Sequence, residues 1–323
     1  MHLSINGKSP GFQVQMLTIP AENNLSMGTA AQENIISQFF FGKATADTEL
    51  PISSYRVLAE GIAITPYTGE NIEGIETTYK VSLFPKATSG NEIVTMYLKD
   101  QKFLLGTDKY GRDLLSRMLV GIRISLAIGF VAVFISLLIG IPMGAIAGYY
   151  GGKVDAAIMW VINVTWSIPT LLLVIAITLA LGKGFWQVFV AVGLTMWVEV
   201  ARVVRGQVLS VKEEQFVTAA RALGFKDFRI ITKHILPNCL APVIIISAAN
   251  FAGAILIESG LSFLGIGAQP PMPSWGGIIK DHYSYIILGK PFLALIPGLA
   301  IMSLVTAFMM IGNGLRDALD VKN

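Results

Sequence analysis

Long runs without charged residues dominate the chain after its first hundred residues. A helix needs about 20 mainly apolar residues to cross the hydrocarbon core of a bilayer, and four of five such runs meet that length. The third run does so if Glu199 and Arg202 lie at the membrane interface. The five runs are Ile124–Gly152, Ala156–Gly182, Gly184–Val198, Asn238–Ile257 and Pro291–Leu315. The pattern predicts an all-α polytopic membrane domain with five visible transmembrane helices.

The first hundred residues have ordinary polarity and contain stretches of β-forming residues separated by Gly, Asn and Pro. These stretches are Phe12–Ile19, Tyr55–Ile64, Thr77–Phe84 and Glu92–Leu98. We therefore expect a small β-rich segment over residues 1–104, followed by the membrane domain over residues 105–323. The sequence favours neither of two roles for the segment, a docking surface for an outside partner and a passive insertion.

Lysine and arginine are distributed unevenly between the predicted loops. Ten fall on the side that carries residues 202–238, the first turn and the C-terminal tail, against seven on the other side. Because cytoplasmic loops carry the excess of Lys and Arg, we expect residues 202–238 to be cytoplasmic and residues 1–121, including the β-rich segment, to be extracytoplasmic.

An exported N-terminal segment needs a signal to cross the membrane. Residues 1–100 contain neither a transmembrane run nor the apolar core of a signal peptide, and the apolar stretch Ile36–Gly42 is too short. Either a sixth, N-terminal transmembrane helix precedes this sequence, which is the interpretation we favour, or the orientation is reversed.

The segment Glu214–Asn238 lies between two apolar runs and has the pattern of a helix, a turn and a second helix. Apolar residues share one face of each predicted helix. These are Phe216, Ala220 and Leu223 in the first helix and Phe228, Ile231 and Ile235 in the second. Gly224 is suited to end the first helix, and Pro237, which lacks an amide donor, is suited to the start of a membrane helix. Such a pair either lies among lipid headgroups or docks into a groove on a cytoplasmic partner.

The spacing within this segment resembles the cytoplasmic loop of integral-membrane subunits of binding-protein-dependent ABC importers. That loop carries Glu-Ala-Ala, three residues, Gly, nine residues, Ile, one residue and Leu-Pro. This chain has Thr218-Ala219-Ala220, then Gly224, His234 and Leu236-Pro237. The two departures, Thr for Glu and His for Ile, resemble the dipeptide/oligopeptide (nickel) branch. Further similarities to that branch are Leu105–Leu126, Glu258–Gly276 and Gly312–Asp320, so the resemblance covers residues 105–323.

The resemblance implies a permease subunit that forms the translocation pathway of an ATP-driven importer for peptides. It implies a heterodimer with a second permease subunit, two ATPase subunits that bind ATP and Mg, and an extracytoplasmic substrate-binding protein, in the cytoplasmic (inner) membrane of a bacterium. The alternatives are a related importer for nickel or sugars, and a non-transporting membrane scaffold whose basic loop binds lipid. By position, the ATPase-docking residues are Phe216, Thr218, Ala219, Ala220, Arg221, Ala222, Gly224, His234, Leu236 and Pro237.

The stretch Leu105–Asp113 precedes the first predicted span, and Thr107 or Asp108 is suited to cap its helix. A structural collar is one interpretation of this stretch. The other is an outer gate or receptor contact, formed by Thr107, Asp108, Gly111, Arg112, Asp113 and Glu258. For Glu258, at the outer end of its span, the alternative is a solvated helix end.

Two patterns inside the spans bear on packing and energy supply. Gly140, Gly144, Gly148 and Gly152 recur every four residues, which lets helices approach closely; we favour packing within this chain over a contact between permeases. With Glu199 at the interface, no predicted span carries a charge at mid-depth, which argues against an ion-coupled carrier.

Sequence motifs for other kinds of chemistry are missing. No G-x-x-x-x-G-K-[ST] phosphate-binding loop occurs, so we expect this chain to bind no ATP by that route. The three histidines form no metal-binding spacing, and we expect no catalytic residues and no metal. A net charge of +3 is too small to argue for nucleic acid.

Overall fold

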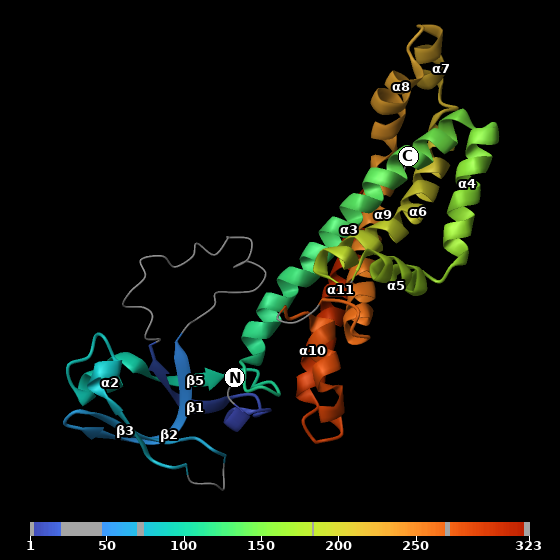
Figure 1. The fold of residues 1–323 in the computed structure, drawn as a ribbon. Coiled ribbons are helices and arrows are strands. Elements are labelled where there is room, and N and C mark those ends of the chain that lie inside the picture. Colours follow the sequence, from blue (N-terminus) through green and yellow to red (C-terminus); the bar gives the residue numbers. More distant parts are fainter. Residues whose placement is uncertain (1–2, 21–46, 70–73, 183, 269–271, 320–323) are drawn as a thin grey trace. The chain divides into compact units, whose positions relative to one another are not determined.

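The computed structural model describes residues 3–20, 47–69, 74–182, 184–268 and 272–319, and these form two compact units. The first unit contains residues 1–123 with 271–273 and 281–296. The second contains residues 124–270, 274–280 and 297–323. The strands belong to the first unit and most of the helices to the second (Figure 1). Each unit has a hydrophobic core of its own.

The first unit is built on a five-stranded sheet with the order β4-β3-β2-β1-β5, in which every neighbouring pair is antiparallel. Side chains on alternate sides of β1 enter two different clusters. Leu17 packs with Ile62 and Phe84, whereas Met16 packs with Phe103. The strands are β1 (Phe12–Ile19), β2 (Thr48–Leu58), β3 (Gly61–Pro66), β4 (Thr77–Lys80) and β5 (Leu98–Phe103). A small β-rich segment is therefore present, as the alternating pattern predicted.

The predicted strand Tyr55–Ile64 is in fact a hairpin, because β2 ends at Leu58 and β3 begins at Gly61. A Cβ atom at Gly61 would overlap the carbonyl oxygen of Tyr79 on β4. The close approach of β4 thus explains why a glycine begins β3. Only the first half of the predicted strand Thr77–Phe84 is extended, since a 3₁₀ turn follows at Val81–Leu83. The apolar stretch Ile36–Gly42 lies outside the described residues.

The prediction of a strand at Glu92–Leu98 is wrong, because α2 (Gly90–Tyr97) occupies this position. The side chain of Ser89 accepts a hydrogen bond from the amide of Glu92, and Glu92 accepts one from the amide of Thr88 at 2.7 Å. These bonds satisfy amides at the start of the helix. Ile93 is fully buried and Tyr97, four residues later, contacts Phe84. Capping and helical spacing therefore outweigh the β-propensity of this stretch.

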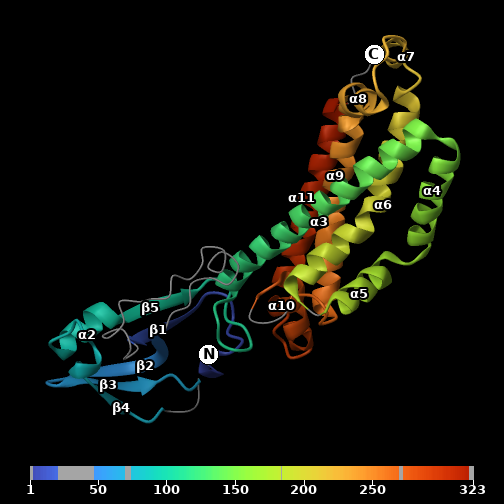
Figure 2. The ribbon, with the colours of Figure 1, turned by 45° about the horizontal axis from the view of Figure 1, so that its top comes forward.

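Helices make up the second unit, and the five apolar runs all fall on them (Figure 2). Four helices are long and apolar enough to cross a membrane. The bent pair α4 and α5, counted as one span, brings the total to five. The helices are α3 (Leu114–Tyr150), which begins in the first unit, α4 (Gly152–Ser167), α5 (Thr170–Leu181), α6 (Phe185–Val211), α9 (Leu240–Phe263), α10 (Trp275–His282) and α11 (Phe292–Leu319).

The predicted span Ala156–Gly182 is broken near its centre, since α4 and α5 meet at an angle of 94°. Ile168 is extended, and Pro169 directly precedes α5. Proline disfavours helical backbone in the residue before it and has no amide to donate. The proline therefore accounts for a break that the apolar pattern conceals.

Glycines on α3 let it pack closely on α6. A Cβ at Gly140 would lie 2.6 Å from Cβ of Val200, and one at Gly148 would lie 2.8 Å from Cβ of Val208. A Cβ at Gly144, midway between them, would overlap the carbonyl oxygen of Ala201. Packing within the chain is thus confirmed for these three glycines. Gly152 has open space around it and a φ of +53°, and it begins α4 instead of packing on α6.

Candidate functional site

The segment Glu214–Asn238 forms two short helices, α7 (Gln215–Ala222) and α8 (Asp227–Ile230), as the sequence predicted. Gly224 has a φ of +75° and ends the first helix. Its amide donates to the carbonyl of Arg221 at 2.9 Å, and the amide of Phe225 donates to that of Ala220 at 3.2 Å. This pair of bonds is a Schellman motif, in which a left-handed residue satisfies the last carbonyls of a helix.

The second helix continues into the membrane domain without a loop. A π-helical turn (Ile231–Ile235) and a 3₁₀ turn (Leu236–Cys239) join α8 to α9, so residues Asp227–Phe263 form one long helical element. Pro237 lies in the 3₁₀ turn at the start of α9, where the sequence placed it. Because proline cannot make the regular helical bond, it accounts for the irregular turns.

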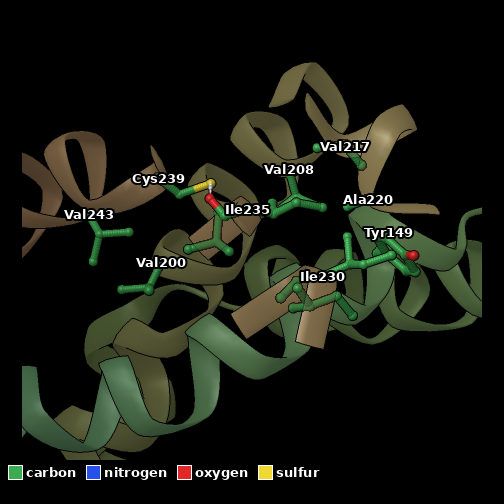
Figure 3. Close-up of a cluster of buried hydrophobic side chains, with 12 residues drawn as sticks. Tyr149, Val200, Val208, Val217, Ala220, Ile230, Ile235, Cys239 and Val243 are labelled. Carbon is green, nitrogen blue, oxygen red and sulfur yellow. Dashed lines mark hydrogen bonds between the residues drawn. The ribbon is translucent and has the colours of Figure 1, made fainter. Parts of the chain in front are cut away.

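The apolar residues of the two helices are divided between a buried face and an exposed face. Val217 and Ala220 pack against Val208 of α6 and Ile235 in a cluster that also contains Tyr149 of α3 (Figure 3). Phe216, Leu223 and Phe228 instead expose 43%, 73% and 78% of their surface. The predicted apolar stripes are therefore wrong in part. Ala220, Ile231 and Ile235 are buried, and the other three members form what we call the exposed triad: Phe216, Leu223 and Phe228.

Polar and aromatic contacts hold the segment to the end of α3. The hydroxyl of Tyr149 donates to Asp227 at 2.7 Å, and the guanidinium of Arg221 lies 5.3 Å from the centre of the Tyr149 ring. The ring of Phe225 stacks on His234 at 5.7 Å. The base of the segment is thus fixed to the helix bundle while the triad faces outward.

Most of the predicted docking residues are accessible. Phe216, Thr218, Ala219, Arg221, Ala222, Gly224 and Pro237 are exposed, His234 and Leu236 are half-buried, and Ala220 is buried. The predicted set missed Leu223 and Phe228, the two most exposed members of the triad. Leu223 lies directly before Gly224 and Phe228 lies at the start of α8. These positions in the sequence could have identified both as docking residues.

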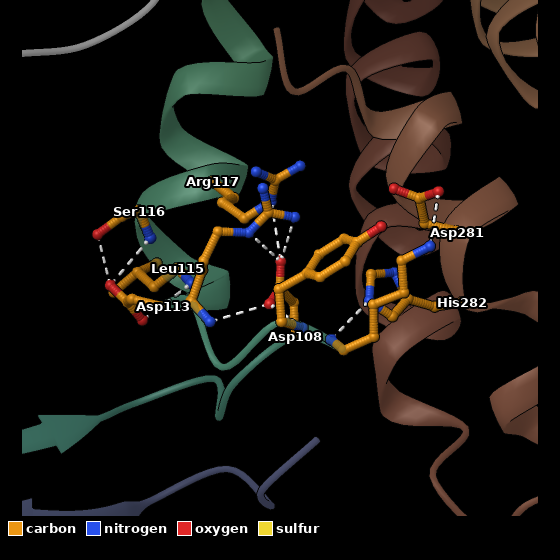
Figure 4. A network of polar contacts seen from close by, with 10 residues as sticks. Asp108, Asp113, Leu115, Ser116, Arg117, Asp281 and His282 are labelled. Atoms are coloured by element: carbon orange, nitrogen blue, oxygen red, sulfur yellow. Dashed lines mark hydrogen bonds and ion pairs between the residues drawn. The ribbon is translucent and has the colours of Figure 1, made fainter. Parts of the chain in front are cut away.

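The loop before α3 is organised around the buried carboxylate of Asp108 (Figure 4). It accepts hydrogen bonds from the amides of Tyr110 and Arg112 at 2.8 and 2.9 Å, and the guanidinium of Arg112 lies 2.6 Å from it. Arg117 is a second cation at 3.4 Å. Gly111, with a φ of +74°, turns the chain between these donors. Asp108 therefore folds the loop and does not cap the helix.

The cap of α3 is Asp113, whose carboxylate accepts from the amide of Ser116 at 3.1 Å and from that of Leu115 at 3.3 Å. The prediction that Thr107 or Asp108 plays this role is wrong. The buried hydroxyl of Thr107 donates to the carbonyl of Ile5 and accepts from the amide of Lys8. Thr107 thus ties the loop to the N-terminal segment.

Lys109 connects the same loop to the end of α10. Its amide donates to Nε2 of His282 at 3.1 Å, and its ammonium lies 3.0 Å from Asp281. Partial burial acts to lower the pKa of Lys109, but the hydrogen bond and charge of Asp281 outweigh it and raise the pKa. The loop is therefore held by charge pairs as well as by backbone bonds.

Glu258 belongs to the other unit, within α9. Its side chain is fully buried and accepts a hydrogen bond from the hydroxyl of Ser262 at 2.6 Å. The interpretation of Glu258 as a solvated helix end is therefore wrong.

Glu199 and Arg202 lie near the middle of α6, which continues to Val211. That both lie at the membrane interface stays a prediction, because α6 has 27 residues and is longer than the roughly 20 that a span needs. Arg202 places its guanidinium 3.8 Å from the centre of the Trp166 ring and donates to Asn163 at 3.3 Å.

Comparison with protein families matches residues 140–322 to the binding-protein-dependent transport system inner membrane component family. The chain belongs to this family of permeases. It is thus a multi-pass membrane protein and a subunit of an ABC importer, not an enzyme.

Two relatives illustrate how similar known permeases are. The permease is 45% identical over 217 residues to the dipeptide transport system permease protein DppC of Alkalihalophilus pseudofirmus, which covers 67% of this chain and 71% of the relative. It is 41% identical over 218 residues to the glutathione transport system permease protein GsiD of Pectobacterium atrosepticum, covering 68% and 72%.

A solved structure supports the fold of the permease. The inward-facing MetNI methionine ABC transporter matches 64% of this chain and 97% of its own chain, with a TM-score of 0.53 and 20% identity. This likeness concerns the fold alone. Within the part of the permease that the structure describes, no group of three or more His, Cys, Asp and Glu residues is placed to hold a metal ion.

Proposed function

We propose that this permease forms the translocation pathway of a peptide importer and is driven by separate ATPase subunits that dock on the segment Glu214–Asn238. The relatives named above transport dipeptides and glutathione, which is itself a short peptide. An oligopeptide permease, OppC of Haemophilus influenzae, is 43% identical over 218 residues, covering 68% of this chain and 70% of OppC. These names support peptides over nickel or sugars as the cargo.

The observation that carries the docking proposal is the exposed triad. Large apolar side chains that gather on an otherwise polar surface mark an interaction site. The triad projects from short helices whose other face is buried in the permease's own core. Exposed Arg221, Lys226 and Arg229 lie on the same segment, and an apolar ridge accompanied by charges suits the helix-in-groove mode of recognition.

The construction of the segment suits it to transmit force. Asp227 is hydrogen-bonded to Tyr149 at the end of α3 and begins the element that continues to Phe263. A partner that moves α8 must therefore move α9 as well.

The proposed assembly contains a second permease subunit as heterodimer partner, two ATPases that bind ATP and Mg, and an extracytoplasmic substrate-binding protein. The segment faces the cytoplasm and residues 1–104 face the other side of the bacterial inner membrane. The excess of Lys and Arg around the segment supports this orientation.

The test compares Gly224→Val with Gly289→Val in the complete transporter, reconstituted in vesicles. Both glycines have a φ of +75° and open space around them, so valine imposes similar backbone strain at each. We expect Gly224→Val to abolish the stimulation of ATP hydrolysis by the binding protein, and Gly289→Val to preserve it. Both variants should insert into the membrane.

Wild-type stimulation in Gly224→Val would overturn the docking proposal, and so would equal loss in both variants. Lipid binding by the segment is a third outcome that would overturn it. In that case, raising the salt concentration would release the segment from anionic vesicles, while single changes in the triad would leave ATP hydrolysis unchanged.

A further inference from the structure

A cavity lined by apolar residues and a few polar ones lies beside the break between α4 and α5, within the second unit. Its volume is about 360 Å³, within the range of roughly 300–1,000 Å³ typical of small-molecule sites. Residues at the break, on α6 and on α9 line it, among them Trp166, Thr170, Thr195, Glu199, Asn250 and Gly253. Broken helices are where transporters commonly build substrate sites.

The cavity contains the side chain of Glu199, which is exposed and has Arg202 as the one cation that acts on its charge among the described residues. Among the described residues, no donor lies within hydrogen-bond or ion-pair distance of Glu199. Arg202, one turn along α6, stacks on Trp166 and donates to Asn163 instead. Glu199 lies 14 residues after the first residue of α6, about 21 Å along its axis. Ionisable residues within transmembrane helices commonly mark substrate or ion pathways.

Asn250 is a second, independent sign of a missing ligand. Its side chain is only 3% exposed, and its buried Nδ2 has no hydrogen-bond partner among the described residues. A buried amide without a partner is destabilising. A ligand in the cavity that offers a carbonyl oxygen would satisfy it.

A second cavity continues the first along the same two helices. It has a volume of about 560 Å³, and Ala249 lines both cavities. Val203 and Gln207 follow Glu199 at spacings of four along α6, and Pro242 and Ile245 line the facing side on α9. From Glu199 to Gln207 the helix rises about 12 Å, the length of three to four extended residues. The two cavities together thus have room for a short peptide.

We propose that Glu199 binds the free ammonium group of the transported peptide and that Asn250 binds a carbonyl of its backbone. This inference rests on the proposed function and adds to it the site and the chemical group that are recognised. Every peptide with a free amino terminus carries both groups, so the site accepts different side chains. The second cavity, whose apolar lining also includes Gln207 and Arg316, takes the residues that follow.

The test measures uptake of radiolabelled dialanine and of N-acetyl-dialanine by the complete transporter in vesicles. The variant is Glu199→Gln, and the matched control is Glu60→Gln, at an exposed position between β2 and β3. For each peptide, the half-maximal concentration for uptake in the variant is divided by that in the wild type. Any preference of the binding protein for one peptide then cancels. Stimulation of ATP hydrolysis is measured in parallel.

We expect Glu199→Gln to raise the half-maximal concentration for dialanine about tenfold or more, as loss of a charge-assisted hydrogen bond implies. The loss for N-acetyl-dialanine should be smaller by about tenfold, because that peptide lacks the ammonium group. Asn250→Ala should weaken uptake of both peptides, because both carry backbone carbonyls. Wild-type dialanine uptake in Glu199→Gln, or equal loss for both peptides, would overturn the site.

Failure of the proposed function has a different signature. In that case the wild-type complex itself would show neither peptide uptake nor stimulated ATP hydrolysis. Loss of uptake in Glu60→Gln would also count against the site, because removal of any carboxylate would then produce the effect.

Discussion

Truncation of Phe228 to alanine tests the docking surface with little risk to the fold. The side chain is 78% exposed, so its removal leaves the core of the segment intact. The neighbouring core residue Ile230 is fully buried and is unchanged. Any loss of partner binding in Phe228→Ala therefore reports on the surface itself.

The expected magnitude follows from exposure. Complete burial of a Phe or Leu side chain is worth about 1.5–3 kcal/mol. For Phe228 the exposed share corresponds to about 1–2 kcal/mol, or a loss of roughly five- to thirtyfold in affinity for the ATPase. Leu223, at 73%, should lose nearly as much. Phe216, at 43%, should lose about 1 kcal/mol or less.

The assay is equilibrium binding of the purified ATPase subunits to the permease in lipid nanodiscs. Ile75→Ala is the matched control, because Ile75 is an apolar side chain 87% exposed on the other unit. We expect the losses to follow the order Phe228, Leu223, Phe216, with the control at wild-type affinity. Unchanged binding in Phe228→Ala, or an equal loss in Ile75→Ala, would refute the reasoning.

Two further predictions concern packing and the loop before α3. Gly144→Ala should be less stable than Gly206→Ala by about 1–3 kcal/mol, because both gain helix propensity but only Gly144→Ala forces a Cβ against α6. Thermal unfolding in detergent measures the difference. Equal stability would show that α3 and α6 are not in close contact. Asp108→Asn should destabilise the first unit by about 3–5 kcal/mol, since it removes the buried counter-charge of the half-buried Arg112 and Arg117. Loss of the helix cap in Asp113→Ala should cost about 0.5–2 kcal/mol. Tryptic cleavage of the first unit reports both, and the opposite order would contradict the role of Asp108.

Features that depend on local pattern could be predicted from the sequence. The five apolar runs became helices, and Gly224 ended α7, because span length and left-handed backbone are properties of short stretches. The glycine spacing on α3 likewise predicted a close helix contact, although it did not identify α6 as the partner helix.

Features that depend on tertiary contacts could not be predicted. Helical spacing put Phe216 and Ala220 on one face of the first helix. Ala220 is buried because it packs in the cluster with Val208 and Tyr149, whereas Phe216 is exposed. Asp108 looked like a helix cap because its neighbourhood in the sequence is polar; the arginines that surround it come together only in the folded loop. The end of the apolar run at Val198 did not predict that α6 continues to Val211.

The docking surface and the proposed peptide site are linked by one element. Phe228 and Asn250 both lie on the helical stretch Asp227–Phe263, separated by 22 residues or about 33 Å of helix rise. The π-helical and 3₁₀ turns at Ile231–Cys239 keep this stretch continuously helical, and Ile231, Ile235 and Cys239 pack in the core of the bundle, so we expect α8 and α9 to move together. A displacement of α8 therefore also displaces Asn250, which lies on the same element. Glu199 lies on α6 and does not share this displacement. Closure of the ATPases would then change the separation of Asn250 and Glu199, and with it the affinity for a peptide that needs both. A spectroscopic distance between labels on α6 and α9 should change when ATP is bound, and should stop changing in Gly224→Val.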